Sequence, residues 1–146
     1  SKLKKYFIKK YYCPDLPHKI SKEIHKFANS SIDVSDGLIS DMSKLINKQN
    51  LSFEIDINKI PISNALKLYL KKSKELKQKF IFNGDDYQIL FTSSKKNRSM
   101  IKSLGKRMNQ KITIIGNINN SFKNNSIKLS NKPLNLSKFQ GYSHKF

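Results

Sequence analysis

The chain has 146 residues, of which 37% are hydrophobic and 10% aromatic, and it carries a formal net charge of +19. This length and composition favour one domain with a substantial core and exclude a disordered chain. No apolar run approaches the about 18 residues that a bilayer-spanning helix needs. The single cysteine, Cys13, excludes an internal disulfide framework, so we expect a reduced, cytoplasmic setting.

The excess of positive charge raises the question of a nucleic-acid-binding domain. Nucleic-acid readers use arginine for bidentate contacts, and among the 29 basic residues only Arg98 and Arg107 are arginines. The lysines are scattered along the chain and form no single stripe. The pattern therefore favours a solvated lysine surface, with nucleic-acid binding as the less favoured alternative.

The first half of the chain mixes helical and extended patterns. Apolar and polar residues alternate strictly in 51–58, which predicts a strand with one buried face. In 37–50 the apolar residues recur at helical spacing and predict one buried stripe. In chain order we expect a basic lead-in over 1–20 with a turn at 13–17, a short helix over 21–29, a strand over 31–35, a helix over 37–50 (stripe Leu38, Met42, Leu45 and Ile46) and a strand over 51–58.

Proline, serine and glycine punctuate the second half. Pro61 and Ser63 predict the start of a helix, and Asn83-Gly84 predicts a turn. In chain order we expect a helix over 64–80, a strand over 87–93, a helix over 97–109, a strand over 112–118 and a further strand over 126–130. Because helices and strands mix without regular strand–helix–strand repeats, we predict an α+β fold: a layered mixed sheet flanked by helices, in one domain over 1–146.

A cluster of chemically useful side chains falls where the strand over 31–35 meets the next helix. Asp33 and Asp36 are three residues apart, and a hard cation such as Mg²⁺ would relieve the repulsion between their carboxylates. Ser35 or Asp36 can cap the helix, and Gly37 permits close approach of a ligand to the backbone. The helix N-terminus offers N–H groups to a phosphate. The cluster indicates either a metal and phosphate site or an ordinary capped helix.

A second cluster follows the turn at Asn83-Gly84. Asp85 and Asp86 are adjacent acids just before an apolar strand. Their side chains are expected to diverge, so one carboxylate can serve a ligand while the other anchors the loop. The alternative is an ordinary polar loop with two solvated acids.

Four segments resemble motifs of the thiamine-monophosphate kinases, in the same order. Residues 31–41, SIDVSDGLISD, resemble the family's "DISDGL..DL" signature, and residues 83–92 resemble its "GGEDYELLFT". Residues 112–118 are similar to its "ITVIGEI" strand, and residues 140–146 to its closing "GYDHF". Together the ordered motifs make the resemblance specific.

The resemblance implies the fold of the C-terminal domain of aminoimidazole ribonucleotide synthase and its superfamily. It implies an ATP-dependent kinase that converts thiamine monophosphate to thiamine diphosphate with Mg²⁺. Members of the family carry a preceding ATP-binding domain that also forms the dimer, and nothing in residues 1–146 matches it. The implied partners are thiamine monophosphate, ATP, that N-terminal kinase domain and a second subunit, with no membrane. By itself the domain is expected to be inactive.

The resemblance also assigns roles, position by position. Asp33 and Asp36 correspond to magnesium ligands, and Ser35 to an ATP contact. Asp85 stands where the family has a substrate-contacting glutamate. Tyr142 corresponds to the terminal aromatic residue that contacts thiamine monophosphate. The main rival is a stand-alone nucleotide- or ligand-binding module without catalysis.

Overall fold

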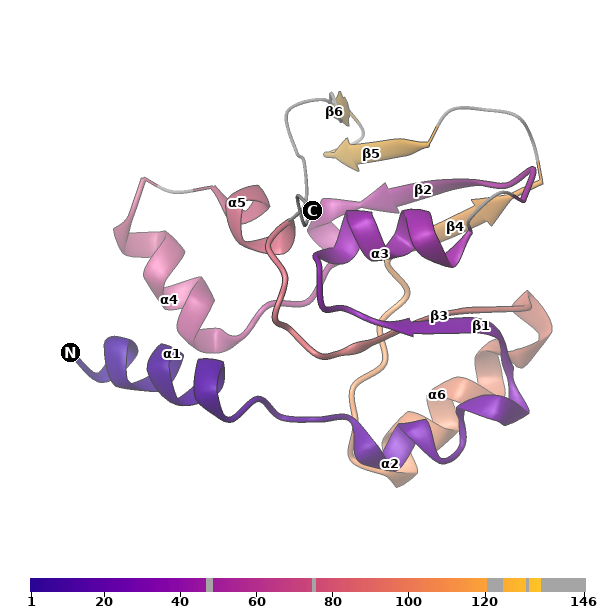
Figure 1. Ribbon diagram of the computed structural model, residues 1–146, viewed down its shortest axis with the longest axis horizontal. Helices are drawn as coiled ribbons and strands as arrows, with labels where there is room; N and C mark the ends of the chain where they lie inside the picture. Colours follow the sequence, from indigo (N-terminus) through magenta and orange to yellow (C-terminus); the bar gives the residue numbers. More distant parts are fainter. Residues whose placement is uncertain (47–48, 75, 121–124, 131, 135–146) are drawn as a thin grey trace, which may run out of the picture.

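The computed structural model describes residues 1–46, 49–74, 76–120, 125–130 and 132–134. In these residues the strands form two sheets, with helices on and beside them (Figure 1). The helices are α1 (Lys2–Tyr12), α2 (His18–Ser21), α3 (Leu38–Leu45), α4 (Asn64–Lys72), α5 (Lys77–Ile81) and α6 (Arg98–Arg107), with 3-10 turns η1 (Ile24–Lys26), η2 (Ile57–Lys59) and η3 (Lys95–Asn97). The strands are β1 (Ala28–Asp33), β2 (Ser52–Asp56), β3 (Ile89–Ser93), β4 (Gly116–Asn119), β5 (Ser126–Leu129) and β6 (Lys132–Leu134).

The two sheets differ in size and in strand direction. β1 and β3 form an antiparallel pair in which Asp33 lies opposite Ile89. The larger sheet has the order β4-β2-β5-β6, with β2 and β5 parallel and both outer pairs antiparallel. The predicted α+β architecture, with a mixed sheet flanked by helices, is confirmed.

The main core lies between α3 and the larger sheet. Leu38 and Met42 of α3 are buried in the same cluster as Phe53 and Ile55 of β2. Burial of a side chain of this size contributes about 1.5–3 kcal/mol to folding. The stripe predicted for this helix is therefore the face that packs on the sheet. The buried members of the cluster are Val34, Leu38, Met42, Ile46, Phe53, Ile55, Ile57, Ile81, Phe82, Leu90 and Ile127.

A smaller core lies on the other side of the β1–β3 pair. Ile20 of α2, Phe27 just before β1 and Leu104 of α6 are buried together. Phe27 also packs edge-on against Phe91 of β3, with ring centroids 5.3 Å apart. In Figure 1, α2 and α6 lie below the pair and α3 lies above it. The β1–β3 pair is thus clamped from both sides, which fixes the position of the turn between β1 and α3.

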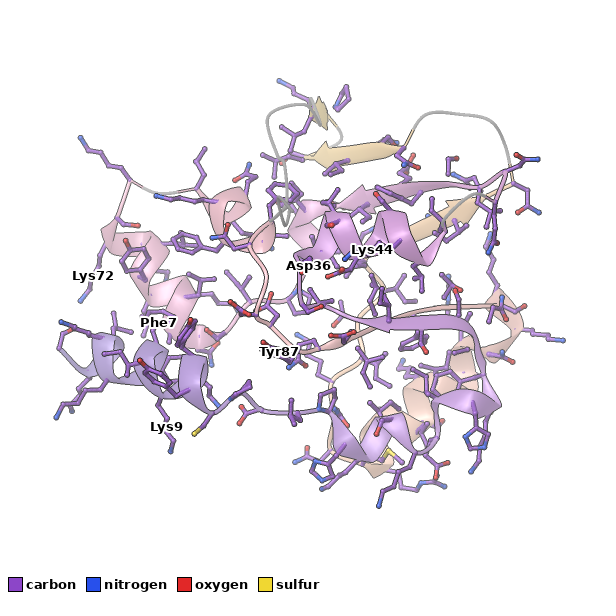
Figure 2. The ribbon with its side chains drawn as sticks, viewed as in Figure 1. Phe7, Lys9, Asp36, Lys44, Lys72 and Tyr87 are labelled. Atoms are coloured by element: carbon purple, nitrogen blue, oxygen red, sulfur yellow. The ribbon has the colours of Figure 1, made fainter. Side chains whose placement is uncertain are left out.

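Residues 1–20, expected as a basic lead-in, contain the helix α1. Phe7 packs edge-on against Tyr69 of α4, with ring centroids 6.3 Å apart. Lys9 of α1 and Lys72 of α4 point into solvent (Figure 2). Because five of the eleven residues of α1 are lysines that interrupt its apolar residues, the pattern does not predict a helix.

The helix expected over 64–80 is divided into α4 and α5. The break allows α5 to turn onto the core, where Ile81 is buried. The ammonium of Lys77 donates to the carbonyl oxygens of Ile57 and Ile60 at 2.8 and 2.6 Å. Desolvation lowers the pKa of Lys77. These tertiary contacts override a sequence pattern that is compatible with one continuous helix.

Other boundaries shift by a few residues. The helix expected over 21–29 is found as the short pieces α2 and η1, and β1 begins at Ala28. The strand expected over 112–118 is β4, which begins at Gly116, where the chain comes against the backbone of Glu54 in β2. Within the described part of the chain, no helix has the length and apolar character needed to cross a membrane.

Candidate functional site

The turn between β1 and α3 is held by backbone hydrogen bonds to the loop before β3. The N–H of Val34 donates to the carbonyl oxygen of Gln88 at 2.8 Å, and the N–H of Tyr87 donates to the carbonyl oxygen of Val34 at 2.9 Å. Val34 is buried in the main core, whereas Asp33 is exposed at the end of β1. The strand alternation therefore places the two side chains on opposite faces.

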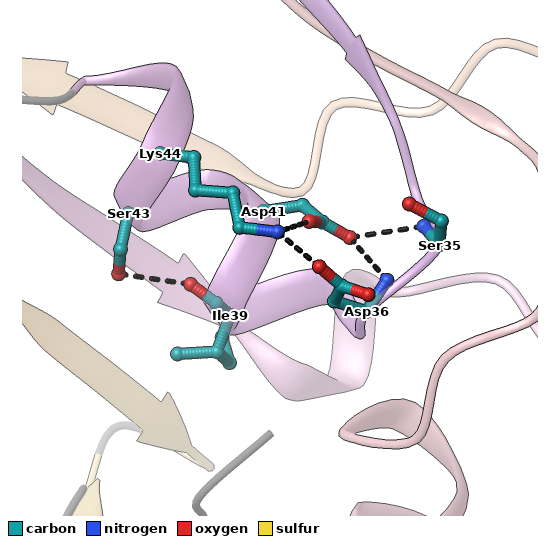
Figure 3. Close-up of polar contacts among 6 residues, drawn as sticks. All are labelled: Ser35, Asp36, Ile39, Asp41, Ser43 and Lys44. Atoms are coloured by element: carbon teal, nitrogen blue, oxygen red, sulfur yellow. Dashed lines mark hydrogen bonds and ion pairs between the residues drawn. The ribbon is translucent and has the colours of Figure 1, made fainter. Parts of the chain in front are cut away.

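The carboxylate of Asp41, in the first turn of α3, closes the β1–α3 turn from inside. Its Oδ2 accepts the N–H groups of Ser35 and Asp36, each at 3.0 Å (Figure 3). The side chain of Asp41 is only 1% exposed, so the buried carboxylate satisfies donors that would otherwise need water. Those two N–H groups are consequently not available to a phosphate.

The expected side-chain cap at Ser35 or Asp36 is not formed. The N-cap residue of α3 is Gly37, which has no side chain to cap with. Instead, the side chain of Asp41, inside the helix, accepts a hydrogen bond from the backbone N–H of Ser35 in the turn. Sequence reasoning gave Asp41 no role. The signal was an acid that continues the apolar stripe of Leu38 at helical spacing, because an acid on a buried face requires hydrogen-bond partners.

Lys44 supplies the positive charge for this turn. Its Nζ donates to Asp41 Oδ1 at 2.9 Å and also to the carboxylate of Asp36 (Figure 3). The hydrogen bond to Asp36, followed by that to Asp41, raises the pKa of Lys44. The ammonium therefore stays charged at neutral pH. It faces one buried carboxylate and one, on Asp36, that is 27% exposed.

Two glycines fix the turn against the second loop. A Cβ on Gly84 would lie less than 3.0 Å from the carbonyl oxygen of Ser35, and a Cβ on Gly37 would lie as close to that of Phe82. Gly37 also has φ +115°, which residues with side chains rarely adopt. The N–H of Asp85 donates to the same Ser35 oxygen at 2.9 Å. The two clusters that are 50 or so residues apart in the chain are thus neighbours in space.

The loop after Gly84 has left-handed residues at Asp85 (φ +66°) and Tyr87 (φ +50°). The hydroxyl of Tyr87 donates to Asp85 Oδ1 at 3.1 Å, and this hydrogen bond raises the pKa of Tyr87. Desolvation of its carboxyl, followed by the charge of Asp85, raises the pKa of Asp86 to about 6, although much of the residue is exposed. The two carboxylates thus differ in environment: Asp85 accepts a hydrogen bond from the Tyr87 hydroxyl, whereas Asp86 has a raised pKa.

Four of the five predicted site residues come together in one region. Asp33, Ser35 and Asp36 lie along the β1–α3 turn, and Asp85 is hydrogen-bonded through its backbone to Ser35. Tyr142, the fifth, lies outside the described residues.

The donor set at this turn suits Mg²⁺ in kind. Asp33 and Asp36 offer carboxylate oxygens, which this hard cation prefers. Among the described residues, no group of three or more His, Cys, Asp or Glu side chains is gathered to hold a metal. The two carboxylates are therefore too few to complete the coordination of a metal ion with protein ligands alone. They fit the common magnesium arrangement in which one or two carboxylates are completed by phosphate oxygens and water.

Comparison with known proteins places the fold. The solved structure described as AaThiL complexed with AMPPCP and TMP matches 99% of this chain and 43% of that chain, with a TM-score of 0.77 and 27% identity. Thiamine-monophosphate kinase from Stenotrophomonas maltophilia matches 83% of this chain and 37% of that chain, with a TM-score of 0.70 and 25% identity. No family model matches the sequence.

Sequence relatives point the same way. Thiamine-monophosphate kinase of Buchnera aphidicola from Schizaphis graminum is 34% identical over 98% of this chain and 44% of its own length. The enzyme of the same name from Aquifex aeolicus is 44% identical over 51% of this chain and 24% of its own length. That of Escherichia coli K12 is 27% identical over 95% of this chain and 42% of its own length.

The fold and the turn at Asp33–Gly37 together define a domain of the aminoimidazole-ribonucleotide-synthase-like class. Within this class the chain is a homologue of the thiamine-monophosphate kinases and corresponds to their C-terminal domain. It spans less than half the length of the curated relatives that it matches.

Proposed function

We propose that the chain is the C-terminal part of an ATP-dependent kinase that phosphorylates thiamine monophosphate to thiamine diphosphate. The observation that carries this proposal is the contact between Ser35 and Gly84, which joins two motifs of the family into one region. The likeness to a solved structure complexed with AMPPCP and TMP supports it. These observations favour a kinase over a stand-alone binding module or a nucleic-acid-binding domain.

In this proposal the residues of the turn serve the nucleotide and those of the second loop serve the substrate. Asp33 and Asp36 hold Mg²⁺, and Ser35 contacts ATP. Asp85 and Tyr142 contact thiamine monophosphate. The exposure of Asp33 at the end of β1 and the partial exposure of Asp36 support the first assignment, because a metal ligand must be reachable.

The chemistry needs positioning more than it needs a reactive side chain. The γ-phosphoryl group of ATP passes to an acceptor phosphate oxygen that is already ionised at neutral pH, so neither a protein nucleophile nor a general base is required. Bound magnesium supplies charge neutralisation between the two anionic reactants. The chain's own contribution is rigidity: Asp41 holds the N–H groups of Ser35 and Asp36, and Gly84 holds the second loop against Ser35. Such preorganisation lowers the entropic part of the barrier.

The rest of the site is proposed to come from outside this chain. We assign the missing magnesium ligands and the remaining ATP contacts to an N-terminal kinase domain, and propose a cytoplasmic homodimer of the full protein. Two facts support this: the carboxylates at the turn fall short of a closed metal site, and the curated relatives are more than twice as long as the matched region.

The experiment is product formation by protein expressed from its complete reading frame. With ATP and Mg²⁺, we expect thiamine diphosphate from thiamine monophosphate and no phosphorylation of thiamine, because the hydroxyl of thiamine is not ionised at neutral pH. Withholding Mg²⁺ should abolish product. ATP hydrolysis without transfer to thiamine monophosphate, or equal transfer to both acceptors, would contradict the proposal.

A further inference from the structure

The ammonium of Lys44 bridges two carboxylates that have different surroundings. Its side chain is 47% exposed, that of Asp36 is 27% exposed and that of Asp41 is 1% exposed. Lys44 and Asp41 are three residues apart on α3, so the helix itself keeps them adjacent. Asp36 lies on the turn, is partly exposed and contacts the same ammonium (Figure 3).

We infer that Lys44 is a counter-cation that a divalent metal ion must displace from Asp36, and that it thereby sets the metal affinity of the turn. The inference rests on the proposed function in one respect, the assignment of Asp36 as a metal ligand. It adds a residue that no motif comparison singled out, since the quoted signature ends before Lys44.

When a metal ion displaces Lys44 from Asp36, Asp41 keeps its contact with Lys44 and is not itself a metal ligand. Its Oδ2 accepts two backbone N–H groups at 3.0 Å, and its Oδ1 accepts the Lys44 ammonium at 2.9 Å. Because the carboxylate is buried, losing these bonds would be costly. The ammonium therefore has a permanent partner in Asp41, and only its contact with Asp36 is exchangeable.

The bridge has two opposite consequences. Without metal, Lys44 reduces the repulsion between two carboxylates across the turn, so the turn keeps its shape. A metal ion held by Asp36 would be repelled by the same positive charge, which Asp41 keeps beside the turn. The interaction of this charge with a doubly charged ion is unfavourable and is partly screened by water, so removing the charge should tighten divalent binding about tenfold.

The experiment is a titration with Mn²⁺ of the protein expressed from its complete reading frame, followed by the paramagnetic resonance signal of the unbound ion. Lys44→Met removes the charge and keeps the length of the side chain. We expect it to bind Mn²⁺ about tenfold more tightly than the unaltered chain, whereas Lys44→Arg should bind as the unaltered chain does. The control is Lys59→Met, which removes the same charge. Lys59 forms a similarly spaced pair with Asp56 at η2. The Mn²⁺ affinity of this variant should not change.

Asp36→Asn separates the inference from the function on which it rests. In the Asp36→Asn background, Lys44→Met should no longer tighten Mn²⁺ binding. If Asp36→Asn weakens binding but Lys44→Met leaves it unchanged, the inference is wrong and the metal role of Asp36 stands. If Asp36→Asn has no effect, the metal role fails and the inference fails with it. Equal tightening by Lys44→Met and Lys59→Met would mean a general charge effect and would overturn the inference.

Lys44→Gln is a second variant that tests the inference in case Lys44→Met does not fold. Glutamine can still donate a hydrogen bond to Asp41 while carrying no charge, and it should tighten Mn²⁺ binding as Lys44→Met does. Thermal unfolding of each variant without metal shows whether it is folded. A folded Lys44→Gln chain with unchanged affinity would overturn the inference even if Lys44→Met failed to fold.

Discussion

Gly84 lies so close to the carbonyl oxygen of Ser35 that a Cβ on this glycine would come within 3.0 Å of it. The next residue, Asp85, donates its N–H to that same oxygen at 2.9 Å. The carbonyl oxygen of Ser35 thus contacts Gly84 and also accepts a hydrogen bond from Asp85. This contact makes the two motifs a single structural unit, and it can be broken by adding one methyl group.

Replacing Gly84 by alanine should separate the two loops. Because the clash is with backbone and not with a flexible side chain, we expect a loss of about 1–3 kcal/mol in the free energy of unfolding. Urea unfolding followed by circular dichroism measures it. Gly105→Ala in α6 is the graded comparison, since its nearest backbone atom would be at 2.9 Å. A loss for Gly84→Ala no larger than that for Gly105→Ala would contradict the proposed interlock.

Asp41→Ala tests the buried carboxylate. It leaves the N–H groups of Ser35 and Asp36 without an acceptor, and we expect the free energy of unfolding to fall by about 3 kcal/mol. Asp56→Ala is the control, because that partly exposed carboxylate accepts one N–H at the start of η2, and its loss should cost about 1 kcal/mol. Similar losses in the two variants, measured by urea unfolding, would show that Asp41 does not hold the turn.

Asp86 should make stability depend on pH in the weakly acidic range. Its pKa is raised from 3.8 in the ordinary case to about 6 in the fold, so between these values the folded chain binds more protons than the unfolded chain. The contribution of Asp86 is therefore favourable below this range, and stability should fall as pH rises from about 4 to about 6. Asp86→Asn should flatten that fall in the midpoint of thermal unfolding. A pH profile identical to that of the unaltered chain would exclude a titrating Asp86.

The periodic elements were predictable from sequence, and the contacts between distant segments were not. The stripe of α3 and the alternation of β2 appear in the residue pattern because each element buries one face. α1 was not predicted because its lysines interrupt the apolar pattern. The division between α4 and α5 was not predicted because it depends on the contact of Lys77 with η2.

The same distinction applies to the site. Asp33, Ser35, Asp36 and Asp85 could be singled out by motif, since each lies in a short segment with a recognisable order. The approach of one loop to the other depends on pairing between β1 and β3, which no local pattern contains. The roles of Asp41 and Lys44 likewise follow only from the folded turn. Tyr142 stays a prediction.

The central claim is that the β1–α3 turn holds the magnesium of a phosphoryl-transfer site, and Asp33→Asn tests it most directly. The measurement is kcat against Mg²⁺ concentration, with ATP and thiamine monophosphate, in protein expressed from its complete reading frame. Asp15→Asn is the control, because that carboxylate is 82% exposed and pairs with Lys10 of α1. We predict a loss of kcat of about 100-fold and a higher Mg²⁺ requirement for Asp33→Asn alone. Unchanged kcat and unchanged Mg²⁺ dependence in Asp33→Asn would contradict the claim.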